Sequence, residues 1–495
     1  MLQSLKQNRT VLVGLIVFTL VYASISLVNH WLFRTSALDL GLYTNAAWKY
    51  AHFMLPDRSL FRWDRDSLFA DHMDLHLMLW APLTYLFGEW TLLIVQIIAI
   101  PFGAYGVYKF SLSISRNKFL ATIAMFSTLG FYGVFSALAQ DFHSNVVACM
   151  ALPWYFYFLH QRKLNATWWV LVFMLVAKEN MGLWLGAVSL AAIGLPYFTH
   201  VPRKLLITQG VVAFGWSVLC IGMIMPALDS ASTYHQMVKY PVLGSSSGEL
   251  FETVFTHPFN VFRAFFEDTE GKHPFGTGLK LEFYFIILLS GAWALIRSWP
   301  FFLMTLPLLA QKMLHEDYTK WGLFAHYSIE FAVLLPLAII TVILQFRSPA
   351  LQRTLGGLSL LLTISATLYV LEFPLEHNEG KDSAHDRLRF YQARHYEPYL
   401  DQSAIHEAMA LIPKNTSVST AYPFVPHLIE REHLYQFPLG QQSDYILLVT
   451  SYFTYPLSQA EFNQEVNKLK SSDAWKLVYD RSKVLLFEKR MAQEP

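Results

Sequence analysis

Residues 10–30, TVLVGLIVFTLVYASISLVNH, form the apolar stretch that decides the class of this protein. A helix needs about 20 apolar residues to cross a bilayer, and this stretch supplies them. It has no convincing small-residue cleavage site before His30-Trp31, so we interpret it as a retained transmembrane helix rather than a signal peptide. Lys6 and Arg9 precede it, and the positive-inside rule therefore places the N-terminus in the cytoplasm.

The composition of the whole chain also indicates a membrane protein. Of the 495 residues, 54% are hydrophobic and only 15% are charged, whereas soluble domains carry about 25% charged residues. The net charge of +1 lacks the basic surplus of a nucleic-acid-binding protein, so we expect no nucleic-acid partner. Cys149 and Cys220 lie in apolar runs, where we expect small buried side chains rather than a disulfide or a metal pair.

Further apolar stretches after the first predict about 11 transmembrane helices in total. They lie at residues 90–112, 118–138, 144–160, 165–178, 181–199, 205–226, 284–298, 300–314, 326–345 and 354–373. A shorter stretch at 75–87 is interrupted by Pro82, and we interpret it as a juxtamembrane helix. If it spanned the membrane, every later loop would change sides and the Lys/Arg-rich turns would lie outside, against the positive-inside rule.

With this topology the acidic and histidine residues gather on the extracytoplasmic side. They lie in a first outer loop (31–89), in a long outer loop (227–283), and in short turns at 141–143, 178–180, 315–317 and 326–327. The basic turns at 116–118, 161–163, 203–204, 297, 347 and 353 fall on the cytoplasmic side. One-sided gathering of Asp, Glu and His above a lipid-embedded bundle is what chemistry on a membrane-bound substrate requires.

Residues 374–495 change in character and predict a small soluble α/β domain on the outer side. We expect helices at 401–412 and 458–470, and strands at 417–420, 445–449 and 484–487. The predicted fold class is thus a mainly α polytopic membrane protein, with a transmembrane domain at 1–373 and a soluble extracytoplasmic α/β domain at 374–495.

The first outer loop holds two candidate catalytic carboxylates, Asp39 and Asp71. Asp39 is either the N-cap of a loop helix or a general base that deprotonates an acceptor hydroxyl. Asp71 lies where we expect a helix to begin, so Asp71-x-x-Asp74 resembles a capping box. On such a helix, Asp71 and Asp74 share one face and His72 and His76 the next, which also fits a divalent metal site.

Three further clusters lie on the same side, and each has a plain alternative. Lys178-Glu179-Asn180 interrupts an apolar run and is either a surface turn or a pair that steers a phosphate. Asp141-Phe142-His143 lies between two apolar spans, where polar residues commonly cap helices and face water. His326-Tyr327 fits an aromatic belt at the membrane interface. The loop at 227–283 is either a mobile lid or a connector.

These residues carry a resemblance to a family of multi-pass prokaryotic membrane proteins known as domain of unknown function 2079. The matching stretches are Leu38-Asp39-Leu40-Gly41-Leu42-Tyr43, Asp71-His72, Asp141-Phe142-His143, Lys178-Glu179, His326-Tyr327-Ser328 and Val425-Pro426-His427-Leu428 with Arg431. The chain departs from the family pattern at Asn180, where an Asp is common, and at Met73-Asp74-Leu75, which replaces Phe-Ser-Pro.

The family in turn resembles the GT-C superfamily of membrane glycosyltransferases, which use polyprenyl-phosphate sugar donors. That resemblance implies Asp39 as base, and Asp71 with His72 in contact with a metal or the donor phosphate. It implies Lys178 and His143 as phosphate contacts, and Glu179 either as a metal ligand or as a residue that supports the ligands from behind. We add Asp74 to the metal set, with Mg²⁺ or Mn²⁺ as the expected ion, and Tyr43, His326 and Tyr327 to the substrate contacts.

We therefore expect a glycosyltransferase of the prokaryotic inner membrane, with membrane lipid around it. It would move a sugar from a polyprenyl-phosphate donor to an extracytoplasmic glycan, lipid or protein acceptor. The alternatives are a transporter or lipid flippase, and a non-catalytic assembly or sensor protein. A transporter predicts ionisable residues at mid-membrane depth and broken helices in two repeats, whereas here the charges concentrate at one face.

Overall fold

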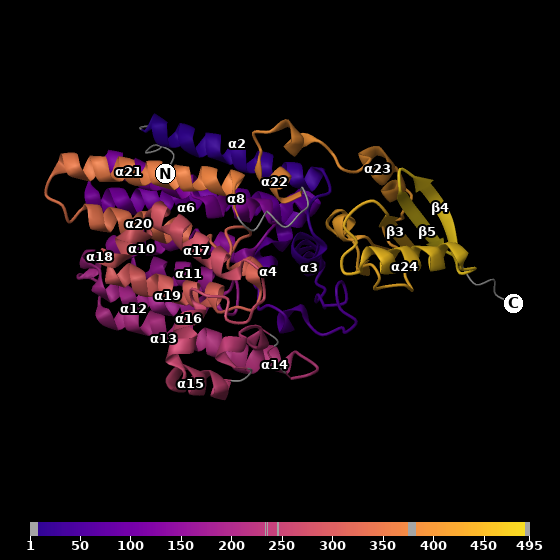
Figure 1. Cartoon of the computed structure of the whole chain (residues 1–495), viewed down its shortest axis with the longest axis horizontal. Coiled ribbons are helices and arrows are strands. Elements are labelled where there is room, and N and C mark those ends of the chain that lie inside the picture. The colour runs from indigo at the N-terminus through magenta and orange to yellow at the C-terminus, as the bar shows by residue number, and fades with distance from the viewer. Residues whose placement is uncertain (1–7, 233, 235, 245–246, 375–382, 491–495) are drawn as a thin grey trace. The chain divides into compact units, whose positions relative to one another are not determined.

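The computed structural model describes residues 8–232, 234, 236–244, 247–374 and 383–490. The chain forms two compact units, which we describe separately (Figure 1). The helical unit comprises residues up to 25, 72–75 and 95–389, and the mixed unit comprises 26–71, 76–94 and 390–495. The predicted boundary at residue 374 thus lies within the helical unit, and the predicted first outer loop groups largely with the C-terminal residues.

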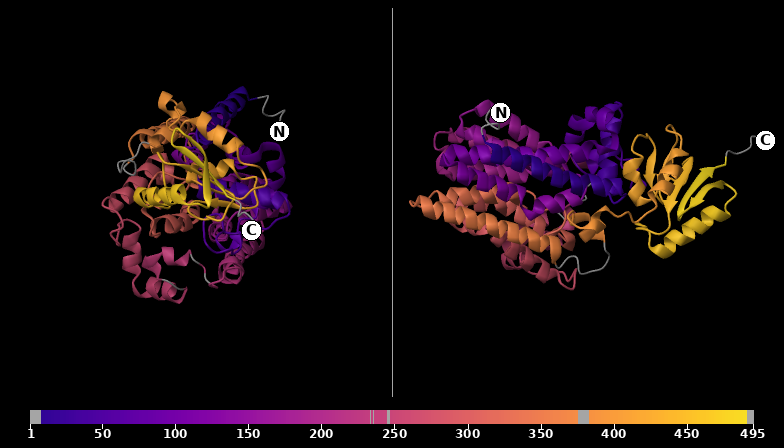
Figure 2. Two further views of the ribbon diagram at one scale, coloured as in Figure 1. Left: turned by 90° about the vertical axis from the view of Figure 1, so that its right-hand side faces the viewer. Right: turned by 90° about the horizontal axis from the view of Figure 1, so that it is seen from above.

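The helical unit is a bundle of mostly apolar helices (Figures 1 and 2). Its helices are α2 (Arg9–Trp31, which ends in the mixed unit), α6 (Thr91–Ser115, which begins there), α7 (Lys118–Leu129), α8 (Tyr132–Ala139), α9 (Ser144–Cys149), α10 (Leu152–His160), α11 (Leu164–Leu175), α12 (Met181–Ala191), α13 (Arg203–Leu219), α14 (Met225–Ala227), α15 (Ser247–Thr256), α16 (Pro258–Ala264), α17 (Gly276–Ile287), α18 (Trp293–Arg297), α19 (Trp299–Met313), α20 (Phe331–Ile343), α21 (Pro349–Glu372) and α22 (Ser383–Leu388). Both cysteines are free and buried, as the sequence predicts.

Within the described residues, six helical stretches are long and apolar enough to cross a membrane. They are Arg9–Trp31, His76–Ser115, Lys118–Ala139, Arg203–Ala227, Gly276–Arg297 and Pro349–Glu372, with shorter apolar helices at Leu164–Leu175, Met181–Gly194 and Phe331–Ile343. A polytopic helical membrane protein is therefore confirmed, whereas the count of about 11 spans is not. The predicted span 144–160, for example, consists of α9 and α10, because Pro153 starts a new helix there.

The predicted loop at 227–283 contains secondary structure of its own. Helices α15 and α16 lie inside it, and α17 begins at Gly276 rather than near residue 284. The candidate span Gly276–Arg297 therefore starts earlier than predicted, and the connection before it is shorter. Two alternatives, a mobile lid or a connector, remain open for the part of this segment that the structure describes.

Helices α12 and α13 approach closely through glycine. A Cβ atom on Gly182 would collide with the carbonyl oxygen of Ala213 and would lie 2.6 Å from Ser217 Oγ. Ser217 Oγ donates a hydrogen bond of 2.6 Å to the backbone oxygen of Glu179, just before α12 begins. The same contact that packs the two helices therefore fixes the turn at residues 178–180.

We expect Gly182→Ala to destabilise the protein by about 1–3 kcal/mol, because the collision involves backbone and forces α12 away from α13. Gly215→Ala is the matched control, since a Cβ atom at Gly215 in α13 meets nothing within 4 Å. Thermal unfolding in detergent checks the pair, with the control unchanged or slightly stabilised by the better helix propensity of alanine. Equal midpoints for the two variants would contradict the close packing.

The mixed unit combines short helices with one five-stranded sheet. Its helices are α3 (Leu42–Ala51), α4 (His76–Trp80), α5 (Thr84–Phe87), α23 (Gln402–Ala410) and α24 (Gln459–Ser471). Its strands are β1 (Val418–Thr420), β2 (Leu434–Gln436), β3 (Tyr445–Val449), β4 (Trp475–Arg481) and β5 (Val484–Lys489), in the order β2-β1-β3-β5-β4. Strand β1 is parallel to both neighbours, β5 is antiparallel to β3 and β4, and α24 packs along the sheet (Figures 1 and 2).

The sequence prediction for the C-terminal residues is confirmed for the helices at 401–412 and 458–470 and for three strands. Helix α24 begins with a capping box in which Ser458 and Glu461 bond reciprocally, which is why its start is readable from sequence. Strands β2 and β4 were not predicted. Strand β4 is largely exposed, so it lacks the apolar pattern that marks a buried strand.

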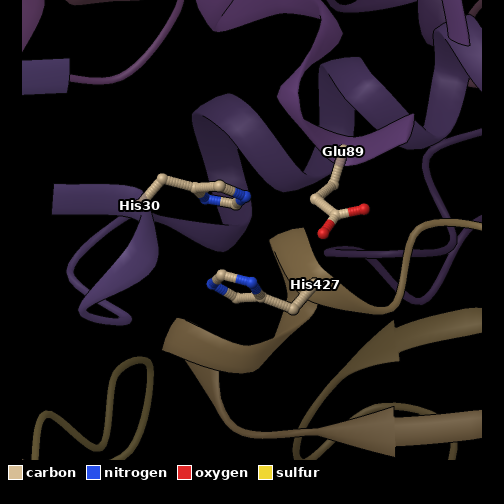
Figure 3. Close-up of side chains that lie close together, drawn as sticks. All are labelled: His30, Glu89 and His427. Atoms are coloured by element: carbon tan, nitrogen blue, oxygen red, sulfur yellow. The ribbon is translucent and has the colours of Figure 1, made fainter. Parts of the chain in front are cut away.

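The end of α2 is fixed by a Schellman motif within the mixed unit. Phe33 N–H donates to the oxygen of His30 (3.0 Å), and Arg34 N–H donates to the oxygen of Asn29 (2.9 Å). Phe33 takes the left-handed position of this motif, with φ +56°, where glycine is usual. This turn holds His30 beside Glu89 and His427 (Figure 3).

Candidate functional site

A pocket in the helical unit is lined by basic, aromatic and amide side chains. The lining residues are Asn145, Lys178, Asn180, Met181, Trp184, Tyr240, Leu308, Gln311, Lys312, Lys320, His326, Tyr327 and Glu330. They come from α9, from the turn before α12, from α12 itself, from the segment between α14 and α15, from α19, and from the segment that precedes α20. Three predicted substrate contacts, Lys178, His326 and Tyr327, thus meet at one pocket.

Glu179 lies beside Lys178 and is almost completely buried. His72 Nδ1 is 3.1 Å from Glu179 Oε1, and the N–H of Met73 donates to Oε2 at 3.2 Å. Burial alone would raise the pKa of Glu179, but His72, Lys178 and a backbone hydrogen bond outweigh it and lower that pKa to about 2. Glu179 is therefore a permanent anion that faces His72.

Three lysines line the pocket against a single carboxylate, that of Glu330. Lys312 Nζ donates to the backbone oxygens of Lys320 and Gly322, so its charge is held in place by the chain. For Lys178, the described residues provide no hydrogen-bond or ion-pair partner to its ammonium group. Lys178 and Lys312 alone outnumber the single carboxylate, so the wall of the pocket carries a net positive charge that suits a phosphate or another anion.

Lys320 differs from the other two lysines in its protonation state. His315 Nδ1 accepts a hydrogen bond from the N–H of Asp317 (2.9 Å), so a neutral ring carries its proton on Nε2. That Nε2 lies 2.9 Å from Lys320 Nζ. Because Nε2–H is a donor, Lys320 Nζ must accept this hydrogen bond, and only a neutral amine has the lone pair to do so. Burial, followed by the charges of Lys178 and Lys239, lowers the pKa of Lys320 to about 7. This amine can take up a proton when an anion enters.

Histidines and amides complete the wall of the pocket. The ring of His143 stacks on that of His326, with centroids 3.4 Å apart and an angle of 23° between the planes. The N–H of His143 donates to Gln96 Oε1 (3.0 Å), and Asn145 Nδ2 donates to Glu330 Oε1 (2.9 Å). His143 is thus joined to the pocket through His326, as the sequence predicts for two groups on the same side.

The segment around Asp71 differs from the prediction. Residues 71–75 are not helical, and α4 begins only at His76, so the predicted capping box and the shared helical faces are wrong. The backbone N–H groups of Met73 and Leu75 bond to Glu179 Oε2 and to the oxygen of Val176. These tertiary partners replace the hydrogen bonds that a helix would have supplied.

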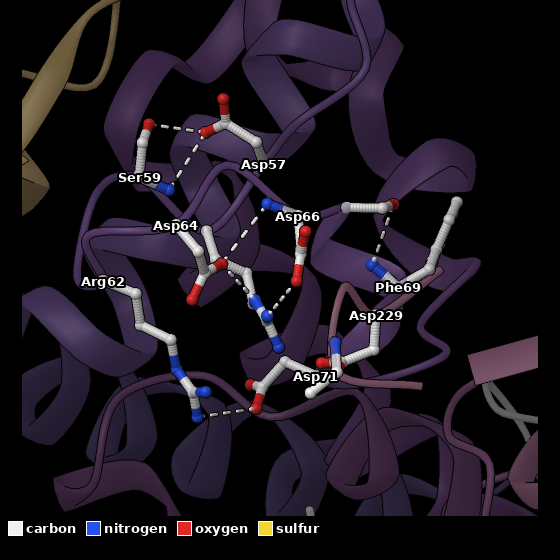
Figure 4. A network of polar contacts seen from close by, with 11 residues as sticks. Asp57, Ser59, Arg62, Asp64, Asp66, Phe69, Asp71 and Asp229 are labelled. Atoms are coloured by element: carbon white, nitrogen blue, oxygen red, sulfur yellow. Dashed lines mark hydrogen bonds and ion pairs between the residues drawn. The ribbon is translucent and has the colours of Figure 1, made fainter. Parts of the chain in front are cut away.

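Asp71 belongs to an acidic network in the mixed unit (Figure 4). Arg62 approaches Asp71 Oδ1 to 3.8 Å, and the buried Arg58 bonds to Asp64 (2.9 Å) and Asp66 (2.7 Å). These arginines order the loop after α3. A structural role therefore accounts for part of this acidic cluster.

Asp39 and Tyr43 also lie in the mixed unit. Ser36 Oγ is 3.3 Å from Asp39 Oδ2, and the N–H of Asp39 is 3.4 Å from Ser36 Oγ. The N-cap of this short helix (Ala37–Gly41) is therefore Ser36, and Asp39 lies in its first turn, so the predicted N-cap role of Asp39 itself is wrong. Tyr43 is buried in α3. The catalytic role of Asp39 and the substrate contact of Tyr43 therefore stay predictions.

The predicted metal set does not converge in the described residues. Glu179 is paired with His72, whereas Asp74 Oδ2 accepts a hydrogen bond of 2.6 Å from Ser144 Oγ. Asp71 belongs to the other unit. No group of three ligand-type side chains close enough to share an ion is found at these positions within the described residues.

Sequence reasoning missed Lys312, Lys320 and Glu330. Lys312 and Glu330 lie inside the predicted spans 300–314 and 326–345. An ionisable residue in an apolar stretch is itself a signal of function, so both could have been found. Lys320 carries no such signal, because it lies in an ordinary polar turn.

A comparison with known protein families identifies the chain as a membrane protein. The model of a family described as predicted membrane protein (DUF2079) matches residues 29–486, which is most of the chain. No curated protein matches it.

Proposed function

Since the chain belongs to the DUF2079 family of predicted membrane proteins, we propose that it is a membrane glycosyltransferase that uses a polyprenyl-phosphate sugar donor. The observation that carries the proposal is the pocket lined by Lys178, Lys312 and Lys320 beside the His72–Glu179 pair. Its function would be to hold the phosphate of the donor and to stabilise the charge that the phosphate gains as it leaves.

The position of the lysines along the chain supports a lipid phosphate rather than a soluble one. Lys178 lies between the apolar helices α11 and α12, Lys312 lies in the last turn of α19, and Lys320 follows it. Ends of apolar helices lie near the membrane surface, where the phosphate of a polyprenyl lipid also lies. Cations at that depth can bind the phosphate while the polyprenyl chain stays in the bilayer.

The reaction is a displacement at the anomeric carbon. The acceptor hydroxyl oxygen forms the new C–O bond, and the anomeric C–O bond to the phosphate breaks with its electron pair passing to the phosphate. A carboxylate base takes the proton of the acceptor, and we propose Asp39 for this role, with Asp71 as the second candidate. Direct displacement inverts the anomeric configuration. We place the site on the extracytoplasmic side of the inner membrane.

Deleting the gene from its native cells should remove one lipid-linked or surface glycan from the profile measured by mass spectrometry. Wild-type protein should restore it, and Asp39→Asn at equal expression should not, because an amide cannot accept the proton. Ser36→Ala is the matched control, since it removes the cap hydrogen bond of Asp39 and keeps the carboxylate. A glycan profile that does not change after deletion would contradict the proposed glycosyltransferase activity. Restoration of the glycan by Asp39→Asn would exclude Asp39 as the base.

A further inference from the structure

Three side chains of the mixed unit converge outside the pocket described above. His30, Glu89 and His427 each present a ligand-type atom, and these atoms all lie within 4.8 Å of one another (Figure 3). The three come from the end of α2, from the short helix η4 (Gly88–Trp90) and from the short helix η14 (Tyr422–His427). Segments far apart in the sequence therefore bring two imidazoles and a carboxylate together.

His30 is oriented as a metal ligand would be. Its ring is fully buried, and its Nδ1 lies 2.9 Å from Thr35 Oγ1. When Nδ1–H donates to Thr35, the lone pair of the neutral ring lies on Nε2. That Nε2 has no hydrogen-bond partner among the described residues, and neither does Nε2 of His427. Buried polar atoms are rarely left without a partner, so these nitrogens indicate a ligand.

Aromatic side chains enclose the two imidazoles. Trp90 meets the ring of His30 edge-on at 4.4 Å, and Phe33 lies 4.3 Å from the ring of His427. Phe33 keeps this position although its φ of +56° is a strained conformation for a residue with a side chain. The surroundings therefore exclude water from one side of the histidines and hold them close to Glu89.

We propose that His30, Glu89 and His427 form a binding site for a borderline divalent cation of the Zn²⁺ class. Two imidazole nitrogens and one carboxylate oxygen are a donor set that Zn²⁺ accepts, and they leave a fourth position for water or another ligand. The rings now stack with centroids 4.1 Å apart and 7° between their planes, so both turn slightly to face the ion. The ion joins the end of α2 to η4 and η14, and thereby ties the C-terminal residues of the mixed unit to its helical part.

Equilibrium dialysis of the purified full-length protein against Zn²⁺ tests this site, with bound metal measured by mass spectrometry. We expect a single Zn²⁺ per chain and a higher thermal unfolding midpoint when it is bound. His30→Gln, Glu89→Gln and His427→Gln should each lower the Zn²⁺ affinity by about 100-fold or more, because each removes a ligand itself. Thr35→Val should lower it by roughly 10- to 100-fold, because it loses only the partner that orients His30.

His406→Gln is the matched control, because His406 is an exposed histidine of α23 whose ring also contacts Phe33. It should bind Zn²⁺ as the wild type does. The site is ruled out if the wild type binds no Zn²⁺, or if the variants at residues 30, 89 and 427 bind it as tightly as the His406→Gln protein. Size-exclusion chromatography of the metal-free proteins distinguishes a loss of Zn²⁺ binding from a loss of folding. If a ligand variant does not fold, the Zn²⁺ affinity of Thr35→Val tests the site instead.

Discussion

Lys178→Met should weaken binding of a polyprenyl phosphate by roughly 10- to 100-fold, because a hydrogen bond to a charged group contributes about 1.5–3 kcal/mol. Lys178 lines the pocket, and no described residue pairs with its ammonium group. Its removal therefore leaves no buried charge unpaired, and the protein should fold normally. Titration of a short-chain polyprenyl phosphate into protein held in nanodiscs measures the effect.

Lys163→Met is the matched control for this substitution. Lys163 is an exposed lysine of the same unit, in the turn between α10 and α11. It should bind the lipid phosphate as the wild type does, which separates loss of the pocket from loss of net charge. Equal affinities for the two variants would contradict an anion site at this pocket.

Glu179→Ala should destabilise the protein more than any other substitution proposed here, by roughly 3–5 kcal/mol, because it leaves the partners of this buried carboxylate, His72 and the N–H of Met73, without a hydrogen-bond acceptor. Glu179 is 1% exposed and accepts from both His72 and the N–H of Met73. The substitution would release residues 72–75 from the turn before α12. Denaturant or thermal unfolding in detergent measures the change.

The same carboxylate predicts how stability depends on pH. The pKa of Glu179 falls from an ordinary value of 4.5 to about 2 in the folded protein. A lowered pKa means that the stabilisation is complete above about pH 4.5 and is lost as the pH falls from there toward 2. Glu179→Ala should therefore lose less stability than the wild type across this range.

The exposed pair Arg263–Glu267 on and after α16 is the matched control. Both side chains are well exposed, so Glu267→Ala should leave stability unchanged within error. If Glu267→Ala destabilises the protein as much as Glu179→Ala does, burial does not explain the contribution of the Glu179 contacts to stability.

The apolar pattern predicted the helices well, because local sequence carries the requirement for about 20 apolar residues across a bilayer. Nearly every predicted stretch corresponds to a helix or a helix pair, and the helix expected at 458–470 is α24. The count of about 11 spans is not confirmed, since breaks such as the one at Pro153 divide apolar runs within the described residues. The exposed strand β4 was missed, because it has no apolar face.

The candidate site was predicted in part. Lys178, His326 and Tyr327 were selected from the one-sided distribution of charge, and the structure brings them to one pocket. The helix expected at Asp71 does not exist, since the backbone there bonds to Glu179 and Val176 instead. Spacing rules of i+3 and i+4 apply only where the segment is helical.

By itself the sequence determined a polytopic helical membrane protein with a small C-terminal α/β part, because both follow from local composition and periodicity. Only the tertiary structure decided which ionisable groups meet. The pairing of His72 with Glu179, the gathering of Lys178, Lys312 and Lys320, and the convergence of His30, Glu89 and His427 each join distant segments. Such contacts depend on how helices pack and where turns place their side chains, which no local pattern encodes.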